Sequence, residues 1–398
     1  MRTSRGRSQG WILDRFVASG GLETLFREAL PYFLEMGYKY VDLLQASEGV
    51  KSAVLLLKGL RRVGEQRLEA AVDAERAGHL LSARDEYHRA AKCFGRAQWM
   101  VFDDNDLKRK LHRQCVSAYE RVIALSDYPM EKVELDLDGG RLHAVLHLPP
   151  DASNVPCVLF CPGLDMIKED YPNVESNALV KRGIAVLSFD GPGHGETRLD
   201  GGLRWQVGPD GDNYGRAARV LVDYLASRPE IDHERVGVFG ISQGSYWGPV
   251  MAAAEPRLKA CACMMGSFYE QGFDLGQPTF KENLMYMTGS ATEDAVEELI
   301  PFITVDGLEE RLRCPLLVLH GELDELTPEE DALRFVERAV NANPRELVIY
   351  ENEFHPLGGV SPQVFNKVAD WLHDRLVRDE ASSDGRPAGL AHGRVQAP

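Results

Sequence analysis

The chain has 398 residues, more than one domain of ordinary size holds, so we expect a large domain with a substantial addition or two domains. Acidic side chains outnumber basic ones 61 to 45, and the formal charge of -16 repels phosphate backbones and anionic lipids. Lysine interrupts the longest apolar runs, such as the one that begins at Val50, well before the roughly 18 residues of a membrane span. These features argue against nucleic acid and membranes as partners.

The amino terminus lacks the pattern of a secretory signal, because three arginines fall within the first seven residues and no suitable apolar stretch follows them. The seven cysteines form no C-x-x-C pair, and most lie in or beside apolar runs, where a free thiol acts as a small hydrophobic side chain. We expect a cytoplasmic protein with reduced cysteines and a flexible arm over residues 1–10.

Residues 11–126 space their apolar side chains with the period of a helix and place glycine mostly at breaks, which predicts an all-helical block. The pattern changes after Tyr128 and Pro129. There KVELDLDGGRLHAVLHLPP alternates apolar and polar residues around a Gly-Gly turn, as an antiparallel hairpin does. We therefore place a domain boundary near residue 127.

Short runs that are apolar on both faces follow the hairpin, and a loop and a helical pattern follow each of them. They are CVLFCPG (157–163), AVLSFDG (185–191), RVGVFGIS (235–242), LKACACMMG (258–266), PLLVLHG (315–321) and ELVIYEN (346–352). Such runs predict a mostly parallel sheet with helices on both faces, an α/β domain over residues 127–378. The last helix is predicted over 362–377, and the tail 379–398, which has no apolar period, is predicted to be disordered.

A G-x-S-x-G motif over residues 240–244 lies directly after the predicted strand RVGVF. Ser242 at its centre is the expected nucleophile, since glycine two residues to each side leaves room for the strained turn between strand and helix. Pro249 falls inside the helix that should follow, where it is expected to remove a hydrogen bond or bend the helix.

The nucleophile needs a base and a carboxylate that orients the base, and in this type of sheet both lie on loops after later strands. Asp324 follows the strand PLLVLHG, and His355 follows the strand ELVIYEN. His194 and His320 also lie at strand ends, and we interpret both as structural residues, with a supporting role near the site left open. Ser242, Asp324 and His355 are therefore predicted to be the catalytic residues.

An oxyanion hole should combine the N–H that follows the nucleophile with one from the loop after an early strand. The predicted donors are the N–H groups of Gln243 and Leu164, and Asp165 beside the latter is a candidate for substrate contact. Asp190 also ends a strand, but the tight Gly-Pro-Gly turn after it favours a buried carboxylate that accepts loop N–H bonds. Further candidates for substrate binding are Tyr246, Glu270 and Asp274.

Several of these segments together resemble one family of α/β-hydrolases. They are the helical SARDEYHRAAKCFGRAQ, the Pro-Gly-Leu-Asp loop followed by Lys-Glu, the FDGPGHGE turn, G-I-S-Q-G and HGELDELTP. Between Phe26 and Leu376 the chain is similar to hydrolases of the 2,6-dihydroxypseudooxynicotine hydrolase type, which are related to the FrsA-like group and to fungal polyketide-shortening hydrolases. The resemblance implies hydrolysis of carbon-carbon bonds beside a carbonyl, in 1,3-dicarbonyl or aryl ketone substrates, under a cap of helices.

The resemblance carries the catalytic roles to Ser242, Asp324 and His355, and the oxyanion loop to Gly163 and Leu164. This chain departs from the family at residue 162, where proline replaces the usual glycine. Some relatives use an acidic residue after the sixth strand, for which the nearest candidates here are the two acidic residues named above, at 270 and 274.

These observations predict a cofactor-free serine hydrolase that acts on a small-molecule carbonyl compound. The resemblance implies that it hydrolyses a carbon-carbon bond beside the carbonyl, in secondary metabolism. The same residues could also serve a thioesterase, an esterase or an acyltransferase, which are the nearest alternatives. A non-catalytic interaction protein is a further alternative, and the intact set of catalytic residues argues against it. No cluster has metal-ligand spacing and no glycine-rich loop fits phosphate, so no metal or cofactor is expected. A homodimer is a candidate oligomeric state.

The helical block at 11–126 is expected to be a cap that closes the site. The usual place for a lid, between the sixth and seventh strands, holds only 48 residues from Ser267 to Cys314. A dry pocket strengthens oxyanion contacts and protects an enolate leaving group. The helical block is the remaining segment with enough apolar residues to cover the pocket.

Overall fold

The computed structural model describes residues 29–269, 280–377 and 390–396, so the predicted arm at 1–10 lies outside the described residues. The first described elements are helices, as the sequence predicts: α2 (Leu30–Glu35), α3 (Tyr40–Ser47), α4 (Ala53–Arg76), α5 (Leu80–Trp99) and α6 (Asp106–Ala124). Side chains cap two of them, since Ser52 accepts from the Leu55 N–H and Asn105 accepts from the Lys108 N–H. Helix α6 ends just before the first strand, close to the predicted boundary.

Within the described residues, nine strands form one sheet in the order β1-β2-β4-β3-β7-β8-β9-β10-β11. The predicted hairpin pairs β1 with β2, β2 also runs antiparallel to β4, and the remaining neighbours are parallel. The strands are β1 (Met130–Leu137), β2 (Gly140–His147), β3 (Val155–Cys161), β4 (Ala185–Asp190), β7 (Ile231–Ile241), β8 (Leu258–Met264), β9 (Leu316–Gly321), β10 (Arg345–Glu351) and β11 (Leu390–Gln396). A separate small hairpin joins β5 (Val207–Gly208) and β6 (Gly211–Asp212).

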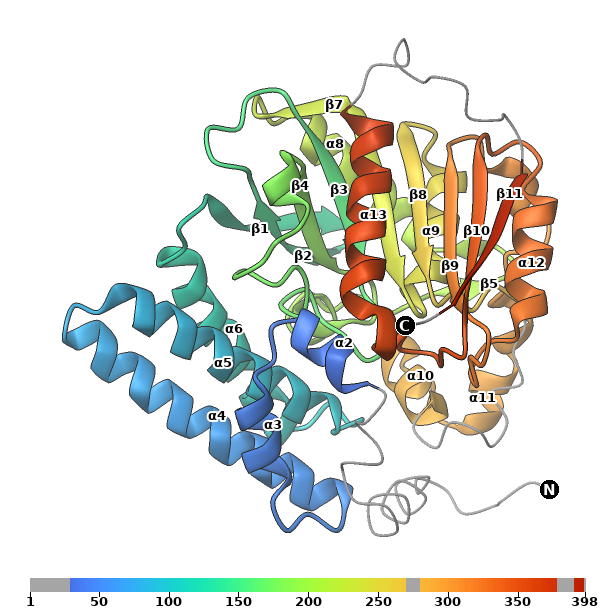
Figure 1. Cartoon of the computed structure of the whole chain (residues 1–398). Helices are drawn as coiled ribbons and strands as arrows, with labels where there is room; N and C mark the ends of the chain where they lie inside the picture. The colour runs from blue at the N-terminus through green and yellow to red at the C-terminus, as the bar shows by residue number, and fades with distance from the viewer. Residues whose placement is uncertain (1–28, 270–279, 378–389, 397–398) are drawn as a thin grey trace.

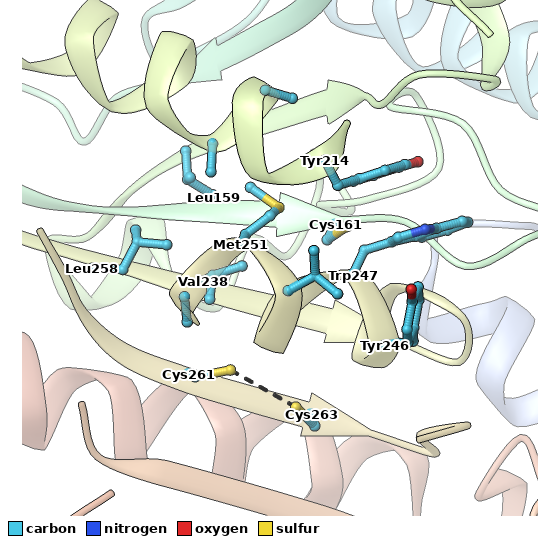
Figure 2. Close-up of a cluster of buried hydrophobic side chains, with 14 of the residues drawn as sticks. Leu159, Cys161, Tyr214, Val238, Tyr246, Trp247, Met251, Leu258, Cys261 and Cys263 are labelled. Atoms are coloured by element: carbon cyan, nitrogen blue, oxygen red, sulfur yellow. Dashed lines mark hydrogen bonds between the residues drawn. The ribbon is translucent and has the colours of Figure 1, made fainter. Parts of the chain in front are cut away.

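Helices cover both faces of the sheet. The helices described after the hairpin are α7 (Gly195–Leu199), α8 (Tyr214–Ala226), α9 (Gly244–Ala254), α10 (Phe280–Thr288), α11 (Glu293–Glu297), α12 (Glu329–Arg338) and α13 (Ser361–Leu376), with short 3-10 turns at Val180–Arg182, Ile300–Phe302, Glu309–Arg311 and Gly358–Val360. Side chains alternate along the strands: Leu159 belongs to the same hydrophobic cluster as residues of α8, α9 and α12, whereas Val158 and Phe160 belong to the cluster that includes residues of α13. Figure 2 shows the first of these layers, in which Leu159 and Val238 meet Met251 and Trp247 of α9.

The amino-terminal helices share their hydrophobic core with the α/β domain. In Figure 1 the helices α3 to α6 lie at the end of the sheet toward which the parallel strands run, as α10 and α11 do. Val145 and Ile167 of the α/β domain pack inside the α4–α6 cluster, and Phe33 of α2 packs in the same cluster as Phe365 of α13. Side chains of the α/β domain therefore complete the hydrophobic cluster of the helical block.

The tail is the clearest difference from the sequence prediction. Residues 379–398 were expected to be disordered, but β11 pairs with β10 in parallel, from Arg345 opposite Leu390 to Glu351 opposite Gln396. The described side chains of β11 are exposed, so the strand needs no apolar period. Backbone pairing along the free edge of β10, together with ion pairs from Arg394, is the physical reason that the prediction of disorder is wrong for this stretch.

Candidate active site

Ser242 lies on a sharp turn between β7 and α9, with φ of 55°, in the left-handed region that a side chain rarely adopts. The two motif glycines make this turn possible. A Cβ at Gly240 would lie 2.0 Å from the Gly244 carbonyl oxygen, and one at Gly244 would lie 2.2 Å from the Cys161 carbonyl oxygen. The turn lifts the Ser242 hydroxyl clear of the sheet, as the motif predicts.

Helix α9 continues through Pro249. Proline has no N–H to donate to the carbonyl of Ser245 one turn earlier. The Cys263 thiol of β8 donates to that carbonyl instead, at 3.6 Å. A buried cysteine on the neighbouring strand thus compensates for the missing backbone bond, which the sequence pattern alone could not reveal.

The three residues predicted to be catalytic lie together at the carboxyl ends of three strands. The Ser242 Oγ lies 2.9 Å from the His355 Nε2, and the His355 Nδ1 lies 2.9 Å from the Asp324 Oδ2. The Asp324 carboxylate also accepts the N–H groups of Leu326 and Thr327, which fix it on the loop after β9. Hydroxyl, imidazole and carboxylate form one continuous chain of hydrogen bonds.

The acid and the histidine shift each other's protonation. Burial alone raises the pKa of Asp324, but the charge and hydrogen bond of His355 outweigh it and lower that pKa to about 2. Burial alone lowers the pKa of His355, but Asp324, with smaller effects from Glu325 and Asp165, raises it above its usual 6.5. The carboxylate is therefore ionised at every working pH and favours a positive charge on the imidazole.

The loop after β3 lies directly against Ser242, since a Cβ at Gly163 would lie 3.3 Å from the Ser242 Cβ. Within the described parts of the chain, neither the Leu164 N–H nor the Gln243 N–H donates a hydrogen bond to another protein group. Both predicted oxyanion donors are thus unused by the protein. The Leu164 carbonyl, in contrast, accepts from the Asn283 side-chain amide of α10 at 3.0 Å.

Asp165 lies in this loop as expected, but its carboxylate forms an ion pair with Arg96 of α5 at 2.7 Å. The Arg96 guanidinium also stacks between two aromatic rings, 4.9 Å from the centre of Phe33 and 4.5 Å from that of Trp99. The helical block therefore holds the residue that the sequence suggested for substrate contact.

Tyr246 does not face the site. The prediction that it contacts substrate is wrong, because the side chain is 1% exposed and its hydroxyl donates to Asp212 at 3.1 Å. Helical rotation explains the error, since four residues beyond Ser242 the side chain points into the layer shown in Figure 2, beside Trp247. Glu270 and Asp274 lie outside the described residues.

Asp190 has the structural role that was preferred for it. The carboxylate is fully buried and accepts from the N–H groups of Lys168 and Glu196 at 2.9 and 2.8 Å. The Lys168 ammonium, 1% exposed, lies within 3.2 Å of Asp190, Glu169 and Glu196. This buried cluster fixes the base of the oxyanion loop and does not reach Ser242 through any hydrogen bond in the described chain.

Sequence reasoning missed the residues of the helical block that hold the oxyanion loop. The buried Lys92 of α5 donates to the carbonyls of Glu169 and Asp170 at 2.8 and 2.6 Å. Tyr38 donates to the Asp170 carboxylate at 3.0 Å. The available signal in the sequence was a lysine among the small residues of a predicted helix. The sequence does not show that this lysine is buried or which carbonyls it contacts.

The remaining features of the described residues concern metal ions, membranes and thiols. No three or more His, Cys, Asp or Glu side chains gather there in a way that could hold a metal ion. No described helix has the length and apolar character to cross a membrane. All seven cysteines are free and buried.

Comparison with known protein families matches residues 66–377 to the family Esterase FrsA-like. This chain belongs to the FrsA-like esterase family. Among curated FrsA-like relatives, the 2,6-dihydropseudooxynicotine hydrolase of Paenarthrobacter nicotinovorans is 29% identical over 347 residues, 86% of this chain and 90% of that protein. Esterase FrsA of Escherichia coli is 28% identical over 309 residues, 74% of this chain and 71% of that protein. The FrsA-like chain is accordingly a hydrolase.

Solved structures agree with this assignment. The crystal structure of the 2,6-dihydroxy-pseudo-oxynicotine hydrolase matches with a TM-score of 0.76 and 27% identity, over 87% of this chain and 96% of that one. AbyA5 matches with a TM-score of 0.59 and 20% identity, over 84% of this chain and 98% of that one, a likeness of fold alone. The predicted α/β-hydrolase fold with amino-terminal helices is confirmed.

Proposed function

We propose that this FrsA-like chain is a cofactor-free serine hydrolase in which Ser242 is the nucleophile, His355 the general base and acid, and Asp324 the residue that orients the imidazole. The observation that carries the proposal is the continuous chain from the Ser242 hydroxyl to the Asp324 carboxylate, with both links at 2.9 Å. Such a chain activates a hydroxyl that is otherwise a weak nucleophile.

In the first half of the proposed reaction, His355 takes the Ser242 proton while the Oγ attacks a substrate carbonyl. The N–H groups of Leu164 and Gln243, which donate to no other described group, receive the oxyanion. When the tetrahedral intermediate collapses, the bond to the leaving group breaks and the electron pair leaves with that group. His355 returns the proton to it.

In the second half, water attacks the acyl group on Ser242. His355 takes a proton from that water, and a carboxylic acid leaves as Ser242 recovers its proton. The electron pair released in the first half can go to carbon if that carbon becomes part of an enolate. A 1,3-dicarbonyl compound, or an aryl ketone whose ring hydroxyl makes it a tautomer of one, can therefore lose a carbon-carbon bond by the same steps. We propose this class of substrate on the likeness to the 2,6-dihydropseudooxynicotine hydrolase.

Ester hydrolysis is the second candidate, favoured by the relatives named Esterase FrsA. The two reactions differ only in the atom that leaves. A screen that identifies products by mass spectrometry, with aryl 1,3-diketones, acyl thioesters and simple esters side by side, separates them. Carbon-carbon hydrolysis is expected to yield a carboxylic acid plus a ketone at a higher kcat/KM than any ester, and turnover of esters or thioesters alone would reject it.

A further inference from the structure

The peptide that joins Gly163 to Leu164 is held on the side opposite to its proposed oxyanion donor. The Gly163 carbonyl oxygen lies 3.1 Å from the His194 Nε2, and it also accepts the Met166 N–H of the same loop at 3.1 Å. A trans peptide is planar and its C=O and N–H point in opposite directions. A partner that fixes the Gly163 oxygen therefore also fixes the direction of the Leu164 N–H.

The neighbours of His194 define which ring nitrogen carries the proton. A carbonyl oxygen can only accept, so the His194 Nε2 must donate. The other nitrogen, Nδ1, lies 2.8 Å from the Tyr214 hydroxyl and accepts from it. Burial lowers the pKa of His194 to about 4, so the ring is neutral in the working range of the proposed reaction.

Aromatic packing fixes the ring as well. The Tyr214 ring stacks on Trp247 with centroids 4.5 Å apart and 4° between the planes, and the His194 ring meets Trp247 edge-on at 5.0 Å. Trp247 belongs to α9, the helix that begins just after Ser242 (Figure 2). Gly191 is required here, since a Cβ would lie 2.4 Å from the Tyr214 ring.

We propose that His194 is a positioning residue for the oxyanion hole: it holds the Gly163–Leu164 peptide so that the Leu164 N–H points at the reacting carbonyl. Its hydrogen bond to the carbonyl also polarises the peptide and strengthens that N–H as a donor. The Tyr214 hydroxyl fixes the imidazole in the form that can donate. This inference rests on the proposed serine hydrolase function.

A second tyrosine–histidine pair in the molecule provides a matched control. The Tyr128 hydroxyl lies 3.0 Å from the Nδ1 of His147, which is fully buried on β2. The His147 Nε2 has no hydrogen-bond partner among the described residues. Replacing His147 thus removes a buried imidazole with the same tyrosine contact and leaves the oxyanion loop untouched.

The kinetic test compares His194→Ala, His194→Gln and His147→Gln in the full chain, with 4-nitrophenyl acetate as the probe. Removing an oxyanion donor costs about 100- to 1,000-fold in kcat, so we expect His194→Ala to lower kcat by about 10- to 100-fold at nearly unchanged KM. The amide of Gln can donate to the Gly163 oxygen, so His194→Gln should recover part of the loss. His147→Gln should retain kcat.

A wild-type measurement does not depend on the stability of variants. Nitrogen-15 NMR of the histidine rings should show His194 neutral and protonated at Nε2 from pH 6 to 9. Protonation at Nδ1, or a kcat of folded His194→Ala no lower than that of His147→Gln, would overturn the inference. If wild-type activity were independent of Ser242, the proposed function itself would fail, whereas Ser242-dependent activity that ignores His194 would reject only the positioning role.

Discussion

Ser242 combines an unfavourable backbone angle with a hydroxyl hydrogen-bonded to His355. We predict that Ser242→Ala keeps the fold and lowers turnover of 4-nitrophenyl acetate by about 10⁴- to 10⁶-fold, because only the oxyanion hole and binding would remain. Steady-state kinetics and circular dichroism of the two proteins check this. A folded alanine variant that kept a large fraction of the wild-type rate would exclude Ser242 as the nucleophile.

Two buried aspartates at strand ends should respond differently to the same substitution. Asp324 accepts from His355, so Asp324→Asn is expected to lower turnover by about 10⁴-fold with little change in melting temperature. Asp190 accepts from Lys168 and Glu196 in a buried cluster, so Asp190→Asn should chiefly reduce stability, by about 1–3 kcal/mol. Kinetics and thermal denaturation of both variants measure these effects. If Asp190→Asn abolished turnover and Asp324→Asn mainly reduced stability, the catalytic and structural roles of the two aspartates would be exchanged.

The pH dependence of activity follows from the partners of His355. The imidazole acts as a base only when neutral, and Asp324, against the effect of burial, raises its pKa above 6.5. Activity should therefore fall as the pH drops through a midpoint above 6.5 in the profile of kcat/KM, which reports the free enzyme. Asp324→Asn removes the negative charge, so its residual activity should show a lower midpoint. An unchanged or higher midpoint would contradict the pairing.

Cationic side chains of helix α5 connect the helical block to the oxyanion loop, which follows β3. Lys92→Met keeps the apolar stem but removes the donor to two buried carbonyls, at Glu169 and Asp170. We predict a loss of about 1–3 kcal/mol in the free energy of unfolding, together with lower turnover. Urea denaturation measures the first effect. The exposed Lys58 of α4 provides the control, and Lys58→Met should change neither quantity.

The sequence predicted elements whose signal is local. Apolar runs such as CVLFC marked the buried strands, and the glycines around Ser242 marked the turn that displays it. It could not predict the edge strand β11, since backbone pairing leaves no side-chain period, nor the direction of Tyr246, which depends on the rotation of α9. Contacts between distant segments, such as Arg96 with Asp165, were equally inaccessible because either residue alone reads as a solvated charge.

At the scale of the molecule, the helical block packs against the α/β domain, because Val145 and Ile167 belong to the hydrophobic cluster of α4–α6 and Phe33 of α2 belongs to a cluster of the α/β domain. We predict that deletion of residues 1–126 gives an insoluble or inactive protein, even toward small activated esters. Expression, solubility and ester turnover test this. Deletion from residue 390 onward removes the edge strand β11, whose described side chains are exposed, and should retain activity. A soluble, fully active protein without residues 1–126 would rule out the cap.

The central claim is that Ser242 is the activated nucleophile of a serine hydrolase. Diisopropyl fluorophosphate reacts with such a serine and leaves a covalent phosphoryl group on it, so the most direct measurement is labelling of the full chain followed by intact-mass analysis and peptide mapping. We predict one label per chain, located on Ser242, with loss of ester hydrolysis in proportion to labelling and no label on Ser242→Ala. A label on another residue, or full activity of the labelled protein, would contradict the assignment.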